Sequence, residues 1–134
     1  MEDIKLNFLH ICDYASVSIG GKLNVLGIFE NIFSSSNDFT HPQLCIVTNI
    51  HIARNGTFKQ TIKIVKASDN SEITKALEFN ITQNAINKTK PPAVGFIGQF
   101  NSIKFSAFGE YIVQVFLDDK KVGEKSFNVT QLPT

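Results

Sequence analysis

Short stretches of alternating apolar and polar residues, separated by turn signals, recur along the whole chain and constrain its fold more than any other feature. In Phe58–Val65, apolar Phe58, Ile62 and Ile64 alternate with lysine and threonine. Alternation at every second residue gives a strand one apolar face and one polar face. Similar stretches cover residues 44–52, 77–82 and 111–117, and a last strand is expected at 122–129. Short strands at this spacing predict an antiparallel β-sandwich.

Local sequence predicts the structure of three connections between strands. Asn55-Gly56 predicts a hairpin between the strand that starts near Phe58 and the strand before it, because both residues tolerate positive φ. Asp118-Asp119 predicts the last turn of the chain. At Ser71–Ala76 the spacing of the apolar residues would also fit a single helical turn, and this alternative stays open. The later alternation favours a strand from about Lys75.

The first thirty residues predict two strands joined by a glycine turn. We expect the first strand at Leu6–Tyr14, the connection at Ala15–Lys22 and the second strand at Leu23–Phe29. Gly20-Gly21 suits a turn because glycine adopts positive φ at no steric cost. Gly27 indicates a bulge or a close backbone approach inside the second strand.

Composition and charge indicate one globular β-sandwich domain over residues 1–134. Hydrophobic residues make up 43% of the chain and charged residues 19%. The net charge is +1 and Arg54 is the single arginine, whereas nucleic-acid-binding proteins usually concentrate lysine and arginine on one face. The chain has neither a basic start followed by an apolar stretch nor an apolar stretch of ~18 residues, so we expect a cytoplasmic protein.

His10, Cys12 and Asp13 come closest to a catalytic group. A nucleophilic cysteine needs a nearby base and a neighbour that lowers its pKa. On a strand, His10 and Cys12 share a face, whereas Asp13 points the other way and cannot orient His10. The sequence therefore predicts a buried structural thiol at Cys12 and no catalytic residue.

The same strand is apolar on both sides, which predicts that Cys12 is shielded. We expect Leu6 and Phe8 on one face and Leu9 and Ile11 on the other. In the cytoplasm, Cys12 and Cys45 are then expected as reduced thiols, and a disulfide between them would require export.

Metal-ligating residues are too dispersed to predict a metal site. Cys45 and His51 lie six residues apart, ~20 Å along one strand, so they cannot reach one ion. His10, Cys12 and Cys45 would meet only if their strands were neighbours. The usual spacings of zinc ligands are absent, and we expect no metal and no cofactor.

Several N-terminal motifs resemble those of a known family. The motifs are Cys12-Asp13-Tyr14-Ala15 after Phe8, then Gly21-Lys22-Leu23-Asn24, then Gly27-Ile28-Phe29-Glu30. This order is similar to the opening of a family of small uncharacterised bacterial proteins. The resemblance implies a small bacterial β domain without an assigned activity, and it transfers no catalytic residue.

A second resemblance concerns the stretch that begins at Gly109-Glu110-Tyr111. It resembles the penultimate strand of immunoglobulin-like sandwiches, where a tyrosine forms a corner by bonding to backbone a few residues upstream. Val113 stands where those domains have cysteine, and the chain contains no tryptophan. The predicted fold is therefore all-β, an antiparallel sandwich with immunoglobulin-like or related Greek-key topology.

These features favour a non-enzymatic binding or protein-interaction module. The loops at 34–38 and 83–92 would be its adaptable segments, or would serve only as connections. One alternative is a small enzyme built on His10, Cys12 or the carboxylates. Another alternative is a peripheral lipid-binding domain like the calcium-dependent sandwiches. Those domains need clustered aspartates, whereas the aspartates of this chain are scattered, and Lys59 and Lys63 make only a short basic stripe.

Lys22, Asn24 and Glu30 are the candidate interaction residues. They flank apolar positions of the second strand, and alternation turns at least some of them outward. A strand would hold them in fixed geometry, as recognition requires. They could instead serve only the turn and the backbone at Gly27. We expect the partner to be another protein, bound by a monomer or homodimer, and expect neither nucleic acid nor membrane as a partner.

Overall fold

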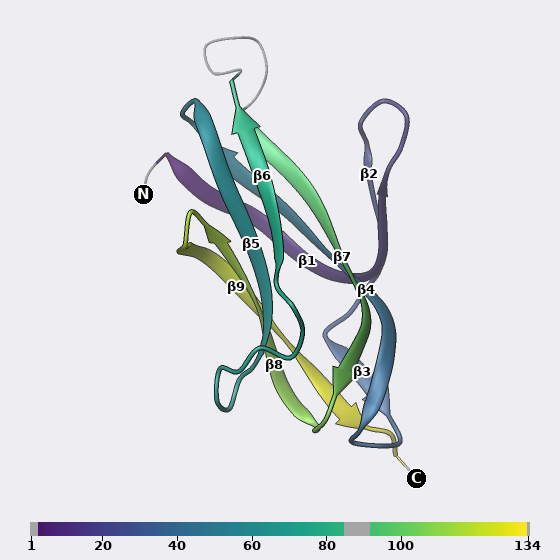
Figure 1. Cartoon of the computed structure of the whole chain (residues 1–134). Coiled ribbons are helices and arrows are strands. Elements are labelled where there is room, and N and C mark those ends of the chain that lie inside the picture. The colour runs from purple at the N-terminus through teal and green to yellow at the C-terminus, as the bar shows by residue number, and fades with distance from the viewer. Residues whose placement is uncertain (1–2, 85–91, 134) are drawn as a thin grey trace.

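The computed structural model describes residues 3–84 and 92–133, which form strands and turns without a helix (Figure 1). The nine strands are β1 (Ile4–Val17), β2 (Leu23–Ile28), β3 (Asn31–Ser34), β4 (Phe39–Ile52), β5 (Gly56–Lys66), β6 (Leu77–Gln83), β7 (Ala93–Phe105), β8 (Gly109–Leu117) and β9 (Lys120–Gln131). Within these residues, no helix could cross a membrane.

Two sheets pack face to face, as the alternation predicts. One has the strand order β2-β1-β4-β7 and the other the order β3-β9-β8-β5-β6. Immunoglobulin sandwiches place strands A, B and E in one sheet and strands C, F and G in the other. Here β1-β4-β7 and β9-β8-β5 take those positions, so the all-β, immunoglobulin-like prediction is confirmed. β2 and β3, which lie between β1 and β4 in the chain, are additional to these strands.

Apolar side chains from the inner faces of both sheets form the main core. Ile11, Ile46, Ile62 and Val113 are fully buried there. Burial of each such side chain stabilises the fold by ~1.5–3 kcal/mol. This core holds the two sheets together and gives the outer faces a rigid support.

An aromatic cluster closes one end of the core around Tyr111. Its ring lies edge-on to Phe105 at 5.0 Å and stacks on Phe127 at 5.8 Å. Its hydroxyl donates a 2.6 Å hydrogen bond to the Ala107 carbonyl. The predicted tyrosine corner at the start of β8 is therefore confirmed.

The hairpin predicted at Asn55-Gly56 is wrong. β4 lies in the four-stranded sheet and β5 in the five-stranded sheet, so residues 53–55 cross between sheets. The reason is that β4 already has β1 on one side and β7 on the other, which leaves no edge for β5. Two contacts hold this crossing in place. The Ala53 amide donates a hydrogen bond to the Asp3 carbonyl, and the Arg54 side chain forms an ion pair with the Asp3 carboxylate at 3.2 Å.

The face predicted for Leu6 is also wrong. A bulge between Leu6 and Phe8 shifts the register of β1 against β4. Leu6 therefore packs with Leu9 and Ile11 into the main core, where it contacts Gly123, while Phe8 points to the outer face. A bulge adds one residue to a strand and so exchanges the faces beyond it.

Ser71–Ala76 forms no helical turn. Ser71 donates to the Asp69 carboxylate from its amide at 3.0 Å and from its hydroxyl at 2.7 Å. These bonds make a local turn and lower the pKa of Asp69. Glu72 bridges to Val65, and β6 begins at Leu77, close to the predicted start.

Two strands were not anticipated from the sequence. β3 lies directly before the expected loop at 34–38 and pairs in parallel with β9. β7 pairs with β4 over nearly its whole length. The other expected loop, at 83–92, falls mostly on residues 85–91, which lie outside the described residues.

Candidate functional site

The end of β1 and the whole of β2 form a two-stranded arm, residues 14–28, at the edge of the four-stranded sheet. β1 pairs with β4 only as far as Cys12, opposite Cys45. From Tyr14 to Val17, β1 pairs with β2 alone. Figure 1 shows this hairpin bending away from the rest of its sheet. The first strand thus extends three residues beyond the predicted end at Tyr14, and the connection shortens accordingly.

The arm bends where Asp13 meets Gly27. Gly27 has φ of 70°, and a Cβ at this position would collide with the Asp13 carboxylate. The pairs on either side, Cys12 with Ile28 and Tyr14 with Leu26, keep the same register. The sequence predicts a bulge or a close backbone approach at Gly27; the structure shows no inserted residue, and the group that approaches Gly27 is the Asp13 side chain.

A small second core anchors the base of the arm on the outer face of the sheet. Cys12, Ala15, Cys45 and Val47 are buried in it, and Val25 of the arm packs against them. A two-stranded hairpin alone is marginal in water, so this contact supports the arm at its base.

Cys12 and Cys45 are free thiols within this small core. The Cys12 thiol donates to the Cys45 carbonyl at 3.6 Å. Burial, and then the nearby Cys45, raises the pKa of Cys12 from 9.0 to about 11. Because the thiolate is the reactive form, Cys12 is a poor nucleophile at neutral pH.

The remaining metal-type residues do not assemble around the two thiols. His10 stacks on Phe8 with the ring centres 5.0 Å apart. His41 lies near Phe29, and burial lowers its pKa. Among residues 3–84 and 92–133, no group of three or more histidine, cysteine or acidic side chains could hold a metal ion.

Most large apolar side chains left in solvent belong to the arm. Eight such residues are exposed in the described part of the chain, and six of them lie between positions 14 and 28: Tyr14, Val17, Ile19, Leu23, Leu26 and Ile28. Ile19 at the tip is fully exposed, and Leu26 in the middle of β2 is 59% exposed. These exposed residues could not be predicted from the alternation, because both alternating sets of Leu23–Phe29 are largely apolar.

The arm also forms one wall of a groove of about 600 Å³. Val17 and Leu23 line it from the arm. Phe8, Val47 and Ile97 line it from the outer face of the sheet, together with Gly95. The concave side of the arm is thus apolar and open to solvent.

The predicted interaction residues all lie on or beside β2. Lys22, Asn24 and Glu30 are exposed. Lys22 and Asn24 lie before the bend at Gly27, at alternate positions with Leu26, whereas Glu30 lies beyond the bend and beyond the end of β2, where its carbonyl accepts from the Asn128 amide of β9. The structure therefore places Lys22 and Asn24 beside Leu26 and separates Glu30 from them.

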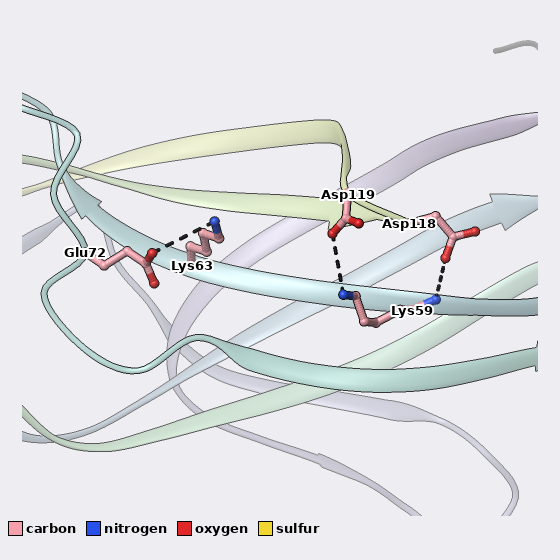
Figure 2. A network of polar contacts seen from close by, with 5 residues as sticks. All are labelled: Lys59, Lys63, Glu72, Asp118 and Asp119. Carbon is pink, nitrogen blue, oxygen red and sulfur yellow. Dashed lines mark hydrogen bonds and ion pairs between the residues drawn. The ribbon is translucent and has the colours of Figure 1, made fainter.

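The basic stripe at Lys59 and Lys63 lies on the outer face of the five-stranded sheet (Figure 2). Lys59 pairs with Asp119 at 3.5 Å, and Lys63 pairs with Glu72 at 3.9 Å. Asp118 accepts a 2.8 Å hydrogen bond from the Lys59 amide. Both lysines thus have acidic neighbours, which weakens the stripe as an anion-binding surface.

The aspartates of this region also form the predicted last turn. Asp118 and Asp119 have φ of 49° and 67°. Positive φ at both central residues is typical of a two-residue hairpin turn, so the turn between β8 and β9 is confirmed.

Comparison with known families supplies the classification. Residues 7–130 match the model of DUF6941, a family of unknown function. The chain belongs to this family. Membership of DUF6941 agrees with the expectation of an uncharacterised domain, and it assigns no activity.

Solved structures share only the fold with this DUF6941 chain. An alkylpurine DNA glycosylase, AlkC, from Pseudomonas fluorescens, bound to DNA with an abasic site analogue, is 9% identical with a TM-score of 0.56. The match covers 96% of this chain and 30% of AlkC. An immunoglobulin-like protein from Pseudomonas aeruginosa is 12% identical with a TM-score of 0.47, covering 94% and 95% of the two chains. A search of curated proteins gave no match.

Proposed function

We propose that this protein is a non-enzymatic protein-interaction module and that the arm is its binding surface. The observation that carries the proposal is that, of the eight large apolar residues exposed in the described part of the chain, six lie on this hairpin. Monomeric soluble proteins rarely leave a large contiguous apolar patch in water, and such patches mark interaction sites.

The environment of Cys12 supports the non-enzymatic part of the proposal. The thiol is buried, and its pKa of about 11 keeps it protonated at neutral pH. His10, its neighbour on the same strand face, stacks on Phe8. Neither residue offers an activated group to a substrate.

Charge supports a protein partner over nucleic acid. The net charge is +1, and the single arginine, Arg54, pairs with Asp3 at 3.2 Å. The likeness to AlkC covers 30% of that enzyme and does not bring its DNA into the proposal. Buried, reduced thiols at Cys12 and Cys45 suit a reducing compartment, and we propose the bacterial cytoplasm.

The test is affinity capture from a native bacterial lysate with a pair of matched variants. Leu26→Ser combined with Val17→Ser removes exposed apolar groups from the arm. Leu132→Ser combined with Phe33→Ser removes exposed leucine and phenylalanine from elsewhere, since these residues are 44% and 56% exposed. We expect the arm variant to lose a protein that the parent and the control variant retain. Equal capture by all three proteins would refute the arm as the binding surface.

A further inference from the structure

We propose that Cys12 and Cys45 form a reversible cross-strand disulfide that locks the base of the arm, with glutathione disulfide or a similar small disulfide as the oxidant. This modification site goes beyond the proposed function and does not depend on it. Three features of the molecule support it: the pairing of the two cysteines, their position where β1 leaves β4, and the cover that the arm gives them.

The two cysteines occupy positions that a disulfide can bridge. Cys12 of β1 and Cys45 of β4 are direct partners in the antiparallel ladder. Opposite residues of such a ladder have Cα atoms about 4.5 or 5.5 Å apart, and disulfides join Cα atoms about 4.4–6.8 Å apart. The strands can therefore accept the cross-link without leaving their register.

Both cysteine side chains belong to the same small core on the outer face of the sheet. The Cys12 thiol reaches the Cys45 carbonyl at 3.6 Å. Cys45 is also among the groups that raise the pKa of Cys12, after burial itself, which reflects the closeness of the two thiols. These are the only cysteines of the chain, so no other intramolecular pair competes with them.

The pair lies where β1 leaves its neighbour in the sheet. Cys12 and Cys45 make the last pair between β1 and β4, and from Tyr14 onward β1 pairs with β2 alone. A covalent bond between the two cysteines holds β1 on β4 at the point where the arm begins. The disulfide would therefore resist separation of these strands from the arm inward.

The arm covers both thiols in the closed fold. Ala15 is buried in the same small core, and Val25 packs against it. The exposed fractions of Cys12 and Cys45 are 0% and 1%. Because a two-stranded hairpin is marginally stable by itself, the arm is the part of this cover that opens most readily. Oxidation then follows opening of the arm and is slow while the arm is closed.

Thiol–disulfide exchange forms the bond in two steps once the arm has opened. One cysteine thiolate attacks a sulfur of glutathione disulfide and expels a glutathione thiolate. The other cysteine thiolate attacks the protein sulfur of this mixed disulfide and expels the second glutathione. The two protein thiols lose two electrons and two protons, and glutathione disulfide is reduced to two glutathione thiols.

A shielded pair of this kind is a slow lock and not a fast sensor. Redox sensors react rapidly because their cysteines are accessible and have a low pKa. Cys12 is buried, and its pKa in the closed fold is about 11. Disulfides of cytoplasmic proteins are usually transient, so the reduced form suits a reducing compartment and the locked form suits a period of oxidation.

Refolding of the full chain from urea in glutathione buffers tests the disulfide. The oxidised buffer should give a monomer with no free thiol in denaturant and with an intact mass lower by two hydrogens. Its urea midpoint should rise by about 1–2 M, because the cross-link joins residues 33 positions apart. A reductant should reverse these changes. Cys45→Ala is the control, and the same oxidant should not raise its midpoint.

Oxidation of the native protein tests the cover. Val25→Ser removes an apolar contact between the arm and the small core, so the disulfide should form about tenfold faster than in the parent. Leu132→Ser is the matched control, because Leu132 is exposed and lies outside the arm. It should oxidise at the rate of the parent. Equal rates in Val25→Ser and Leu132→Ser would overturn the arm as the cover of the thiols.

Three results of the refolding experiment would overturn the disulfide. They are glutathione retained as a mixed disulfide, dimers linked between chains, and an oxidised form that unfolds at a lower urea concentration than the reduced form. Lysate capture by the arm is measured on the reduced protein. Failure of the disulfide is therefore distinguishable from failure of the proposed function.

Discussion

Cys12 of β1 and Cys45 of β4 lie directly opposite each other, and both thiols are buried and free. We expect neither to react with a thiol reagent in native protein at pH 7–8, because access is blocked and the pKa of Cys12 is about 11. Titration with a chromogenic disulfide measures the number of thiols that react and their rate. Both thiols should react at once in denaturant, which serves as the control. Rapid modification of the native protein would contradict the buried-thiol interpretation.

The raised pKa of Cys12 predicts a loss of stability in alkali. The folded state keeps the proton up to about pH 11, whereas an unfolded thiol releases it near 9.0. The stabilisation is therefore complete below pH 9 and is lost as the pH rises from 9 to 11, on the order of 2 kcal/mol. Urea denaturation at several pH values should show this decline in the parent and a weaker decline in Cys12→Ala. Parallel curves for the two proteins would contradict it.

Removal of the Tyr111 hydroxyl should destabilise the sandwich. Its 2.6 Å bond to the Ala107 carbonyl is made at a buried side chain. Tyr111→Phe should therefore lower the free energy of unfolding by ~1 kcal/mol, and Tyr111→Ala by ~3 kcal/mol or more because a core cavity forms. Tyr14→Phe is the control, since Tyr14 is half exposed and should change stability by less than ~0.5 kcal/mol. An unchanged denaturation midpoint for Tyr111→Phe would show that the bond contributes nothing.

The framework of the sandwich could be predicted because its strands face the core on one side and water on the other. In β5, Ile62 and Ile64 are buried while Lys63 is only partly covered, as the alternation implies. The tyrosine corner was also predictable, because its bond is local in sequence. Periodicity and short-range motifs describe each strand by itself and do not say which strands pair.

The pairing of strands was less accessible from the sequence. Asn55-Gly56 favours a turn, but a turn preference does not say whether the flanking strands share a sheet. The bulge that moves Leu6 into the core cannot be recognised from the alternation of apolar and polar residues. The arm was missed because both sets of alternating positions in Leu23–Phe29 are largely apolar, so periodicity could not show that β2 stands in solvent. Lys22, Asn24 and Glu30 were found because they are polar, and whether they bind a partner stays a prediction.

Substitution of Gly27 should destabilise the bend of the arm. Gly27→Ala imposes φ of 70° on a residue with a side chain and drives its Cβ into the Asp13 carboxylate. We expect a loss of at least ~1–2 kcal/mol in the free energy of unfolding. The same change in an Asp13→Ala background should cost less, because the collision is removed and only the backbone strain remains. Gly95→Ala, whose Cβ would make ordinary contacts at 3.9 Å, is the control. Equal losses at Gly27 and Gly95 would contradict a constrained bend.

Replacement of Lys22, Asn24 and Glu30 by alanine separates recognition from folding. All three side chains are exposed, so the triple variant should stay within about 0.5 kcal/mol per site of the parent in urea denaturation. It should also lose the arm-dependent partner in affinity capture, because the polar contacts on and beside β2 are gone. The control replaces Lys75, exposed outside the arm, with alanine. A sharp fall in stability of the triple variant would mean that these residues serve the turn and the bend of the arm, and a stable variant that keeps its partner would confine recognition to the apolar side chains of the arm.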